Sequence, residues 1–144
     1  MNIQSLRNNK VLIEQYLEAL GSLDGNKARA FMHEDYSCRI ISAAVKPDMY
    51  DAAGFCHFIE GFKAILATRI EFTVVEMTAE ENRVSTLANG FSTTIDGKPY
   101  NNEYHFLNHI RDGKVIGHLE FMDSYLGAET LGPIMARLRR EKKR

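Results

Sequence analysis

The sequence has little cysteine, the residue that forms disulfide cross-links and many metal sites. It has no tryptophan and only two cysteines, Cys38 and Cys56, which form no CxxC pair. Two isolated cysteines argue against a disulfide framework and against a cysteine-based metal site. We expect both to be small buried residues in a protein from a reducing compartment.

Long apolar runs are also missing. No stretch approaches the roughly 18 consecutive apolar residues that a membrane-spanning helix requires. The first residues, Met-Asn-Ile-Gln-Ser-Leu-Arg, contain no apolar region of the kind found in a signal peptide. The sequence therefore predicts a cytoplasmic protein that makes no contact with a membrane.

Neither sign of charge dominates, since the chain has 18 basic and 19 acidic residues and a net charge of −1. Such a balance gives no field that would attract nucleic acid. The local exception is the basic run over 137–144. A run of this kind at the end of a chain is typically the frayed, solvated end of a helix, so we expect no nucleic-acid partner.

The chain does have the composition of a soluble globular domain, with 44% hydrophobic and 26% charged residues. Its 144 residues are enough to bury a sizeable core. No internal repeat, low-complexity stretch or linker divides them. We expect one domain over 1–144, ending in the basic tail at about 137–144.

The first half of the chain has mainly helical periodicity. The apolar spacing predicts helices over 4–20, 24–33 and 52–67, and a strand over 36–42. Asp24 (or Ser22) and Asp51 precede two of these helices and are expected to cap them. The segment 43–50 contains Pro47 and is expected to form a loop.

From residue 69 onward the period changes to two, which is typical of strands. The predicted elements are strands over 69–78 and 83–95, the two arms of a hairpin over 101–123, and a last loop and helix over 124–140. Gly90 suggests a bulge or bend in its strand, and Gly132-Pro133 suggests an interruption of the last helix. This order indicates an α+β fold, in which a cone-shaped, curved antiparallel sheet carries helices on its concave face and leaves a pocket at its open end.

The hairpin over 101–123 carries most of the side chains that could do chemistry. Its turn, Asp112-Gly113, is a strong hairpin signal because glycine tolerates the positive φ angles that tight turns need. Its arms hold three of the five histidines, His105, His109 and His118, together with Glu103, Glu120 and Asn108.

Two registers of this hairpin are open, and they differ in which side chains share a face. A two-residue turn pairs His105 with Glu120 and gathers the three histidines and Glu120 on one face. A three-residue loop, with the turn glycine as a left-handed bulge residue, pairs Tyr104 with Glu120 and Phe106 with His118. The apolar pattern alone slightly favours the first register, because it yields one cleaner apolar face.

A family resemblance is carried by residues 112–120 (Asp-Gly-Lys-Val-Ile-Gly-His-Leu-Glu), Asp123 and Leu131-Gly132. They resemble the Asp-Gly-Lys-Ile, His-x-Asp, Asp and Leu-Gly pattern of SnoaL-like proteins. Tyr16 sits like the oxyanion-binding tyrosine of ketosteroid isomerases. The chain thus resembles the SnoaL-like polyketide cyclase and ketosteroid isomerase-like branch of the nuclear transport factor 2-like superfamily. The resemblance covers nearly the whole chain in element order and is weakly specific for any one activity.

At the level of single residues the resemblance is partial. Glu120 stands where SnoaL-type cyclases have their acid/base aspartate. Phe106 stands where those cyclases have a catalytic histidine and the isomerases a hydrogen-bonding aspartic acid. The base aspartate of the isomerases would fall near Ile40, where this chain has no carboxylate.

The resemblance favours the three-residue loop, because it places the positions of both Phe106 and Glu120 on the cavity wall, and we adopt that register. Seven side chains are then expected to point toward the helices: Tyr104, Phe106, Asn108, Ile116, His118, Glu120 and Met122. Six are expected on the outer face: His105, Leu107, His109, Val115, Leu119 and Phe121. An outer face that exposes Leu119 and Phe121 predicts a homodimer formed through it.

The predicted site has Glu120 as the general acid or base and His118 as the partner that orients it or relays its proton. Four residues are expected to bind the substrate: Tyr16, Tyr104, Phe106 and Asn108. Tyr16 and Asn108 would donate hydrogen bonds to a ligand oxygen. The alternative for each polar residue is a satisfied structural side chain in the core.

We therefore expect a protein that binds a hydrophobic small molecule and acts on a hydrophobic carbonyl compound as an isomerase, cyclase or dehydratase. His105 and His109 are four residues apart on a strand, which does not suit a metal site, so neither a metal nor a cofactor is expected. The alternative function is a non-catalytic ligand-binding or dimerisation module on the same fold.

Overall fold

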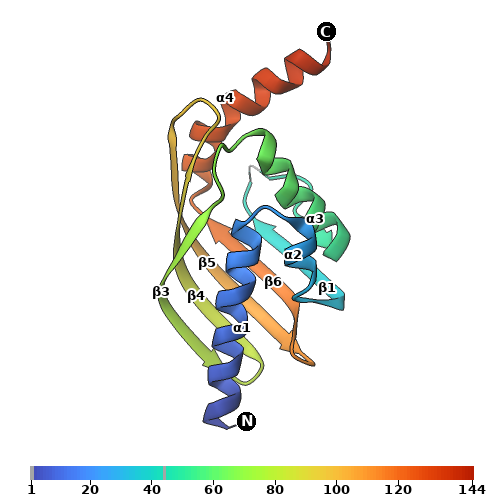
Figure 1. The fold of residues 1–144 in the computed structure, drawn as a ribbon, viewed down its shortest axis with the longest axis vertical. Coiled ribbons are helices and arrows are strands. Elements are labelled where there is room, and N and C mark those ends of the chain that lie inside the picture. The colour runs from blue at the N-terminus through green and yellow to red at the C-terminus, as the bar shows by residue number, and fades with distance from the viewer. Residues whose placement is uncertain (1, 44) are drawn as a thin grey trace.

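A six-stranded sheet and four α-helices form the structure, a computed structural model that describes residues 2–43 and 45–144 (Figure 1). The helices are α1 (Ile3–Gly21), α2 (Gly25–Arg29), α3 (Ala52–Gly61), which a 3-10 turn (Phe62–Ala64) extends, and α4 (Ser124–Lys142). The strands are β1 (Met32–Ile41), β2 (Met49–Asp51), β3 (Glu71–Glu80), β4 (Arg83–Thr93), β5 (Pro99–Arg111) and β6 (Lys114–Met122). Their order in the sheet is β2-β1-β6-β5-β4-β3.

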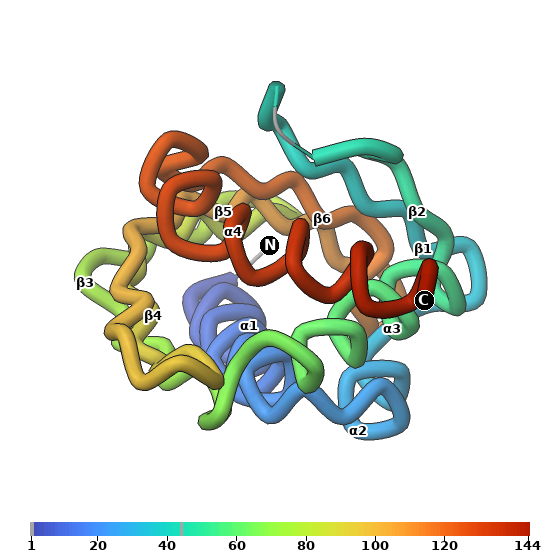
Figure 2. The backbone as a smooth tube through the Cα atoms, turned by 90° about the horizontal axis from the view of Figure 1, so that it is seen from above, coloured from blue at the N-terminus to red at the C-terminus, as the bar shows by residue number. Residues whose placement is uncertain are grey.

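The sheet is curved, and α1, α2 and α3 lie on one side of it (Figure 1). Seen from above, α4 crosses the end of the space between the sheet and these helices (Figure 2). The predicted α+β fold, with helices against a curved sheet, is confirmed. One pairing differs from the antiparallel arrangement, because β1 runs parallel to β6.

The helix starts follow from local capping. The Asp24 side chain accepts hydrogen bonds from the backbone N–H groups of Asn26 and Lys27, and Asp51 accepts one from Gly54. Both predicted caps are confirmed, since these carboxylates satisfy N–H groups that the first helical turn leaves unpaired. The second helix ends at Arg29 rather than at residue 33, because β1 begins at Met32.

Two other expectations about the elements are wrong. Residues within the predicted loop 43–50 contribute to β2, a three-residue strand that pairs antiparallel with β1. The last helix is not interrupted, and Pro133 lies inside α4. Proline has no N–H group, so the Glu129 carbonyl, four residues before Pro133, has no backbone donor from that position. Pro133 and Glu129 are both exposed, so water can solvate this carbonyl.

The hairpin turn has two residues, Asp112 and Gly113, with φ angles of 52° and 70°. Positive φ at both positions is typical of the type I′ turn, and Arg111 pairs with Lys114 across it. The three-residue loop that we expected is therefore wrong.

A bulge in β6 then changes the register. His109 pairs with Gly117 while Ile110 pairs with Val115, so Ile116 is an extra residue. Beyond it, Phe106 pairs with Glu120 and Asn108 with His118. The expected pairs Tyr104–Glu120 and Phe106–His118 are wrong by two residues.

A shift of two residues keeps every side chain on its expected face. The inner face accordingly buries Tyr104, Phe106, Asn108, His118 and Glu120, as expected. Next to the bulge the expectation fails, because Val115 is buried and Ile116 is half-buried.

Gly90 does not mark a bulge, since β4 and β5 pair without a register shift along their length. The bulge in this part of the sheet lies in β3, where pairing with β4 shifts between Val74 and Glu76. Gly90 instead allows close packing, because a Cβ atom there would lie 2.7 Å from Tyr104 Cε2 and 3.1 Å from Ile70 Cγ2.

The apolar side chains form two clusters. The larger lies between the sheet and α1 to α3, and it contains Ile13, Leu17, Ile40, Phe55, Val84 and Phe106. The smaller lies under α4, and it contains Leu23, Ile65, Leu66, Ile70, Leu131 and Ile134. Phe72 packs against both clusters. Cys38 is buried in the larger one, Cys56 is half-buried, and both are free thiols.

The outer face of the sheet is partly apolar. Leu87 of β4, His105 of β5 and Phe121 of β6 form one cross-strand row, and Leu87 and Phe121 are each 42% exposed. The predicted homodimer stays a prediction.

Within the described residues, no helix is long and apolar enough to cross a membrane, and the cytoplasmic location stays a prediction.

The packing of Gly90 can be tested by Gly90→Ala. The added methyl group would overlap the Tyr104 ring, so we expect the free energy of unfolding to fall by about 1–3 kcal/mol in urea titrations. Gly132→Ala is the matched control, because a Cβ atom there meets no atom within 4 Å. That variant should be unchanged or more stable by up to about 1 kcal/mol. Equal effects of the two substitutions would contradict the packing role of Gly90.

Candidate functional site

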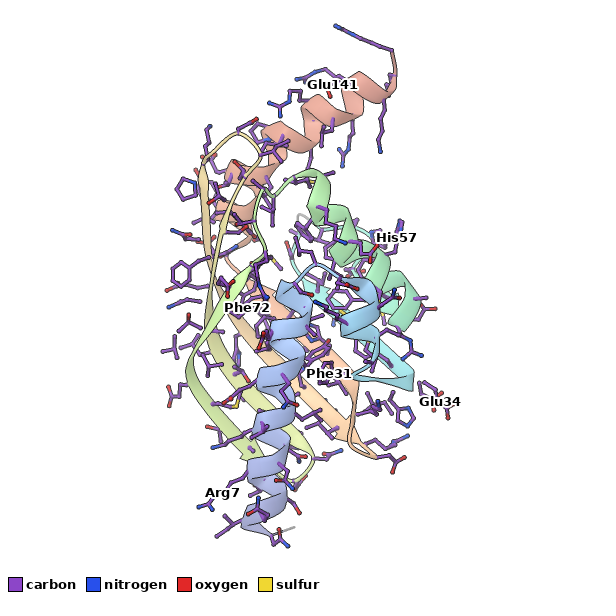
Figure 3. The ribbon with its side chains drawn as sticks, in the orientation of Figure 1. Arg7, Phe31, Glu34, His57, Phe72 and Glu141 are labelled. Carbon is purple, nitrogen blue, oxygen red and sulfur yellow. The ribbon has the colours of Figure 1, made fainter. Side chains whose placement is uncertain are left out.

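A cavity of about 590 Å³ lies between the sheet, α3 and α4. Its wall is mostly apolar and includes Phe55, Phe58, Phe62, Ile70, Phe72 and Leu131. Figure 3 shows Phe72 on β3 and His57 on α3, which contribute to the wall from different elements. This volume is typical of sites for small organic molecules, which are mainly apolar with a few polar groups.

Three polar side chains of the sheet reach this wall: Glu120 of β6, and Tyr100 and Tyr104 of β5. Glu120 is 8% exposed. The Tyr104 hydroxyl lies 3.4 Å from that of Tyr100, which also accepts a hydrogen bond from Asn102 Nδ2 at 3.1 Å. The apolar cavity thus has one carboxylate and two phenols on its sheet side.

Behind Glu120 lies a chain of buried polar groups. Glu120 Oε1 is 3.1 Å from His118 Nε2. On the other side of the ring, His118 Nδ1 is 2.9 Å from Asn108 Nδ2 and 3.1 Å from the Tyr16 hydroxyl. Tyr16 in turn lies 2.8 Å from the Tyr36 hydroxyl. The chain therefore runs from the core to the cavity wall and ends in a carboxylate.

Strand pairing brings these groups together. Asn108 and His118 are direct partners between β5 and β6, and Cys38 and Ile40 of β1 pair with His118 and Glu120. Tyr36 lies two residues before Cys38 on the same strand. The helix α1 buries Tyr16 on its apolar face, so its hydroxyl reaches this cluster from above the sheet.

A family model, the SnoaL-like domain, matches residues 13–118. The chain belongs to the SnoaL-like family. The match ends at His118 and covers most of the elements that build the cavity. Membership of the nuclear transport factor 2-like superfamily, expected from the sequence, is confirmed.

Solved structures share this fold. PrhC from Penicillium brasilianum is similar over 95% of this chain and 91% of its own, with a TM-score of 0.80 and 19% identity. BvnE pinacolase from Penicillium brevicompactum matches 93% of this chain and 99% of its own, at 0.79 and 14%. A nuclear transport factor 2-like protein from Burkholderia pseudomallei matches 86% and 97%, at 0.74 and 14%. No curated protein matches the sequence.

In this SnoaL-like site the neighbours of His118 decide where its ring proton lies. Asn108 Nδ2 can only donate, and the Tyr16 hydroxyl can donate, so Nδ1 is the acceptor. We infer from this network that the neutral ring carries its proton on Nε2 and donates it to Glu120 Oε1.

Burial keeps the tyrosines of the SnoaL-like site protonated. It raises the pKa of Tyr16, Tyr36 and Tyr104 well above the ordinary value of 10.0. Burial, with the charge of Glu120, also raises the pKa of the Cys38 thiol. These groups are therefore neutral hydrogen-bonding groups rather than anions at neutral pH.

The structure places the six predicted site residues in two layers. Glu120 and Tyr104 line the cavity. The other four, His118, Tyr16, Phe106 and Asn108, are buried behind them. None of these four is among the described residues that line the cavity. Their predicted catalytic or substrate-binding roles stay predictions. The hydrogen bonds show that Tyr16 and Asn108 hold the His118 ring.

Sequence reasoning missed Tyr36 and Tyr100. Tyr100 is four residues before Tyr104 on one strand and therefore on the same face, a signal that could have been read. Tyr36 of β1 meets Tyr16 of α1 only through the tertiary fold, for which no local pattern exists. Among residues 2–43 and 45–144, no three His, Cys, Asp or Glu side chains are placed to hold a metal ion.

The buried chain can be tested by a double-mutant cycle. Tyr16→Phe removes the hydroxyl that bridges Tyr36 and His118, so we expect the free energy of unfolding to fall by about 1–3 kcal/mol. Tyr36→Phe together with Tyr16→Phe should cost less than the sum of the single changes, because no tyrosine hydroxyl is then left buried without its partner. Urea unfolding measures all three.

Tyr125→Phe serves as the control, since Tyr125 is 74% exposed and its hydroxyl should contribute little. Strictly additive losses at positions 16 and 36 would show that the two hydroxyls are not coupled.

Proposed function

We propose that the protein binds a hydrophobic carbonyl compound in the cavity and moves a proton within it by general acid/base catalysis. The observation that carries this proposal is a carboxylate on the wall of an apolar cavity, with a buried histidine directly behind it. Isomerisation, cyclisation and dehydration all need such a step. The proposal requires no cofactor.

Glu120 is the proposed base. Its carboxylate takes a proton from a carbon next to the carbonyl group, and the electron pair of that C–H bond moves toward the carbonyl oxygen. The protonated Glu120 then returns the proton at a second position. His118, through Nε2, keeps one carboxylate oxygen in a fixed orientation while the other faces the substrate.

Tyr104 and Tyr100 are the proposed donors to the carbonyl oxygen. Both line the cavity, and a phenol O–H can donate a hydrogen bond to an oxygen that gains negative charge. Burial keeps the Tyr104 phenol protonated, because it raises the pKa of that group. Tyr16 and Asn108 act one layer further back, as positioning residues for His118.

The relatives support small-molecule chemistry on this fold. One structure of similar fold is the BvnE pinacolase, and most of the elements that build the cavity lie within residues 13–118, which the SnoaL-like family model matches. At 14% identity, the pinacolase shares the scaffold rather than a demonstrated mechanism.

The role of Glu120 can be tested by Glu120→Gln, with a substrate first found by screening hydrophobic ketones. The amide has nearly the same shape but is no base, so we expect turnover to fall by about 10²–10⁴-fold while the KM changes little. Turnover is followed by NMR or chromatography. Glu103→Gln is the matched control, because Glu103 lies on the exposed outer face of β5. Full turnover by Glu120→Gln would remove Glu120 from the mechanism.

A non-catalytic ligand-binding module is the second candidate function. It is favoured by Phe106, which is fully buried in the core. By the resemblance to SnoaL-type cyclases, this is the position of a polar catalytic residue in those proteins. It is also favoured by Ile40, which lies beside Glu120 without adding a second carboxylate. Ligand binding without turnover across the same ketone screen would support this candidate.

We further propose that two copies pair through the outer sheet face, since Leu87, Phe91 and Phe121 are each more than 40% exposed there. Phe121→Lys should convert the dimer to monomers in sedimentation velocity experiments. Val11→Lys, on α1 with Val11 51% exposed, should leave the dimer intact. A wild-type monomer at micromolar concentration would contradict this proposal.

A further inference from the structure

The cavity wall has an uneven distribution of charge. Its basic side chains come from three separate elements: Lys46 from the segment between β1 and β2, His57 from α3, and Arg139 from α4. His57 and Arg139 are exposed and Lys46 is 69% exposed at its side chain, so all three lie at the solvent side. Glu120 is the only carboxylate among the described residues of the wall, and it is buried.

Arg139 is available for a ligand, whereas its neighbour Arg137 is not. Arg137 donates two hydrogen bonds of 3.0 Å to Asp96 and lies 3.9 Å from Glu141. Of the ion pairs found among the described residues, none involves Arg139. Lys46 pairs with Asp48 at 3.2 Å, but an ion pair this exposed is weak and can be exchanged.

We propose that the ligand of this cavity is a hydrophobic carboxylic acid, whose carboxylate stays at the rim with Arg139 and Lys46 while its apolar body fills the cavity. This inference rests on the proposed function, because it concerns the same cavity. It adds the chemical class of the ligand and the direction in which the ligand enters.

Electrostatics gives that direction. A carboxylate at the buried end would face the charge of Glu120 across a wall with little solvent, where repulsion between like charges is strong. At the rim it meets two cations in water. A ligand with a single acidic end is therefore held with that end outward, which brings the opposite, carbonyl-bearing end to Glu120.

The volume suits such a molecule. A cavity of about 590 Å³ holds a body of several fused rings or a branched chain. The aromatic side chains Phe55, Phe58 and Phe72 face this body. They supply the affinity by burial of apolar surface, while Arg139 and Lys46 select the acidic form.

The test uses two fluorescent probes with the same body, 1-pyrenebutyrate and 1-pyrenebutanol, in equilibrium titrations. We expect the wild-type protein to bind pyrenebutyrate more tightly than pyrenebutanol. Arg139→Met should weaken pyrenebutyrate binding by about fivefold, the size expected for one exposed charge contact, and should leave pyrenebutanol binding unchanged. Lys46→Met should act in the same direction. Higher salt should weaken only pyrenebutyrate binding.

Arg140→Met is the matched control, because Arg140 is the next residue of α4, is exposed and is absent from the cavity wall. It should affect neither probe. Ala128→Trp, which adds a large ring to the α4 side of the wall, should abolish binding of both probes and so place them in the cavity. Thermal unfolding of each variant shows that the fold is kept.

Equal wild-type affinity for the two probes would overturn the proposed ligand class. Equal losses of pyrenebutyrate binding in Arg139→Met and Arg140→Met would also overturn it, because they would indicate attraction to the basic tail as a whole. Failure of the proposed function looks different. In that case Glu120→Gln would keep full turnover of the ketone found by screening, whatever the two probes show.

Discussion

One extra residue in a strand decides what this site can be. Side chains of a strand alternate between its two faces, so a register change of one residue moves a whole set of side chains to the other side of the sheet. The type I′ turn at Asp112-Gly113 alone would send His118 and Glu120 to the outer face. The bulge at Ile116 turns them back toward the helices, and the cavity, the buried chain and the apolar outer face all depend on that reversal.

The reversal buries a histidine, and burial of a polar ring has to be compensated by hydrogen bonds. Asn108 compensates it from the neighbouring strand and Tyr16 from α1. These contacts tie the helix to the sheet at a defined point, since a tyrosine hydroxyl has to lie within about 3 Å of its partner. The same contacts orient the ring so that its Nε2 faces Glu120. Fold stability and site geometry therefore depend on the same few atoms.

Much of this could be predicted from local signals. The caps Asp24 and Asp51, the position of the hairpin turn at Asp112-Gly113 and the inner face of the hairpin away from the bulge follow from chemistry within a few residues of each other, and they are correct. The pairing itself could not be predicted, because a three-residue loop and a two-residue turn followed by a bulge place the side chains beyond them on the same faces. Tyr36 was missed for another reason, since its contact with Tyr16 joins side chains of β1 and α1 that only the tertiary fold brings together. The role of each predicted site residue depends on a ligand, which no local pattern describes.

Phe72 gives the molecule a property that belongs to neither cluster alone. It packs against both apolar clusters and lines the cavity between them, and its ring contacts Tyr104 and Phe106 edge-on at centroid distances of 5.2 and 5.7 Å. A molecule bound in the cavity therefore packs against both apolar clusters, the one in the main body of the protein and the one under α4. Binding to the folded state alone shifts the folding equilibrium by mass action. The abundance of the folded protein in a cell would then follow the supply of its ligand.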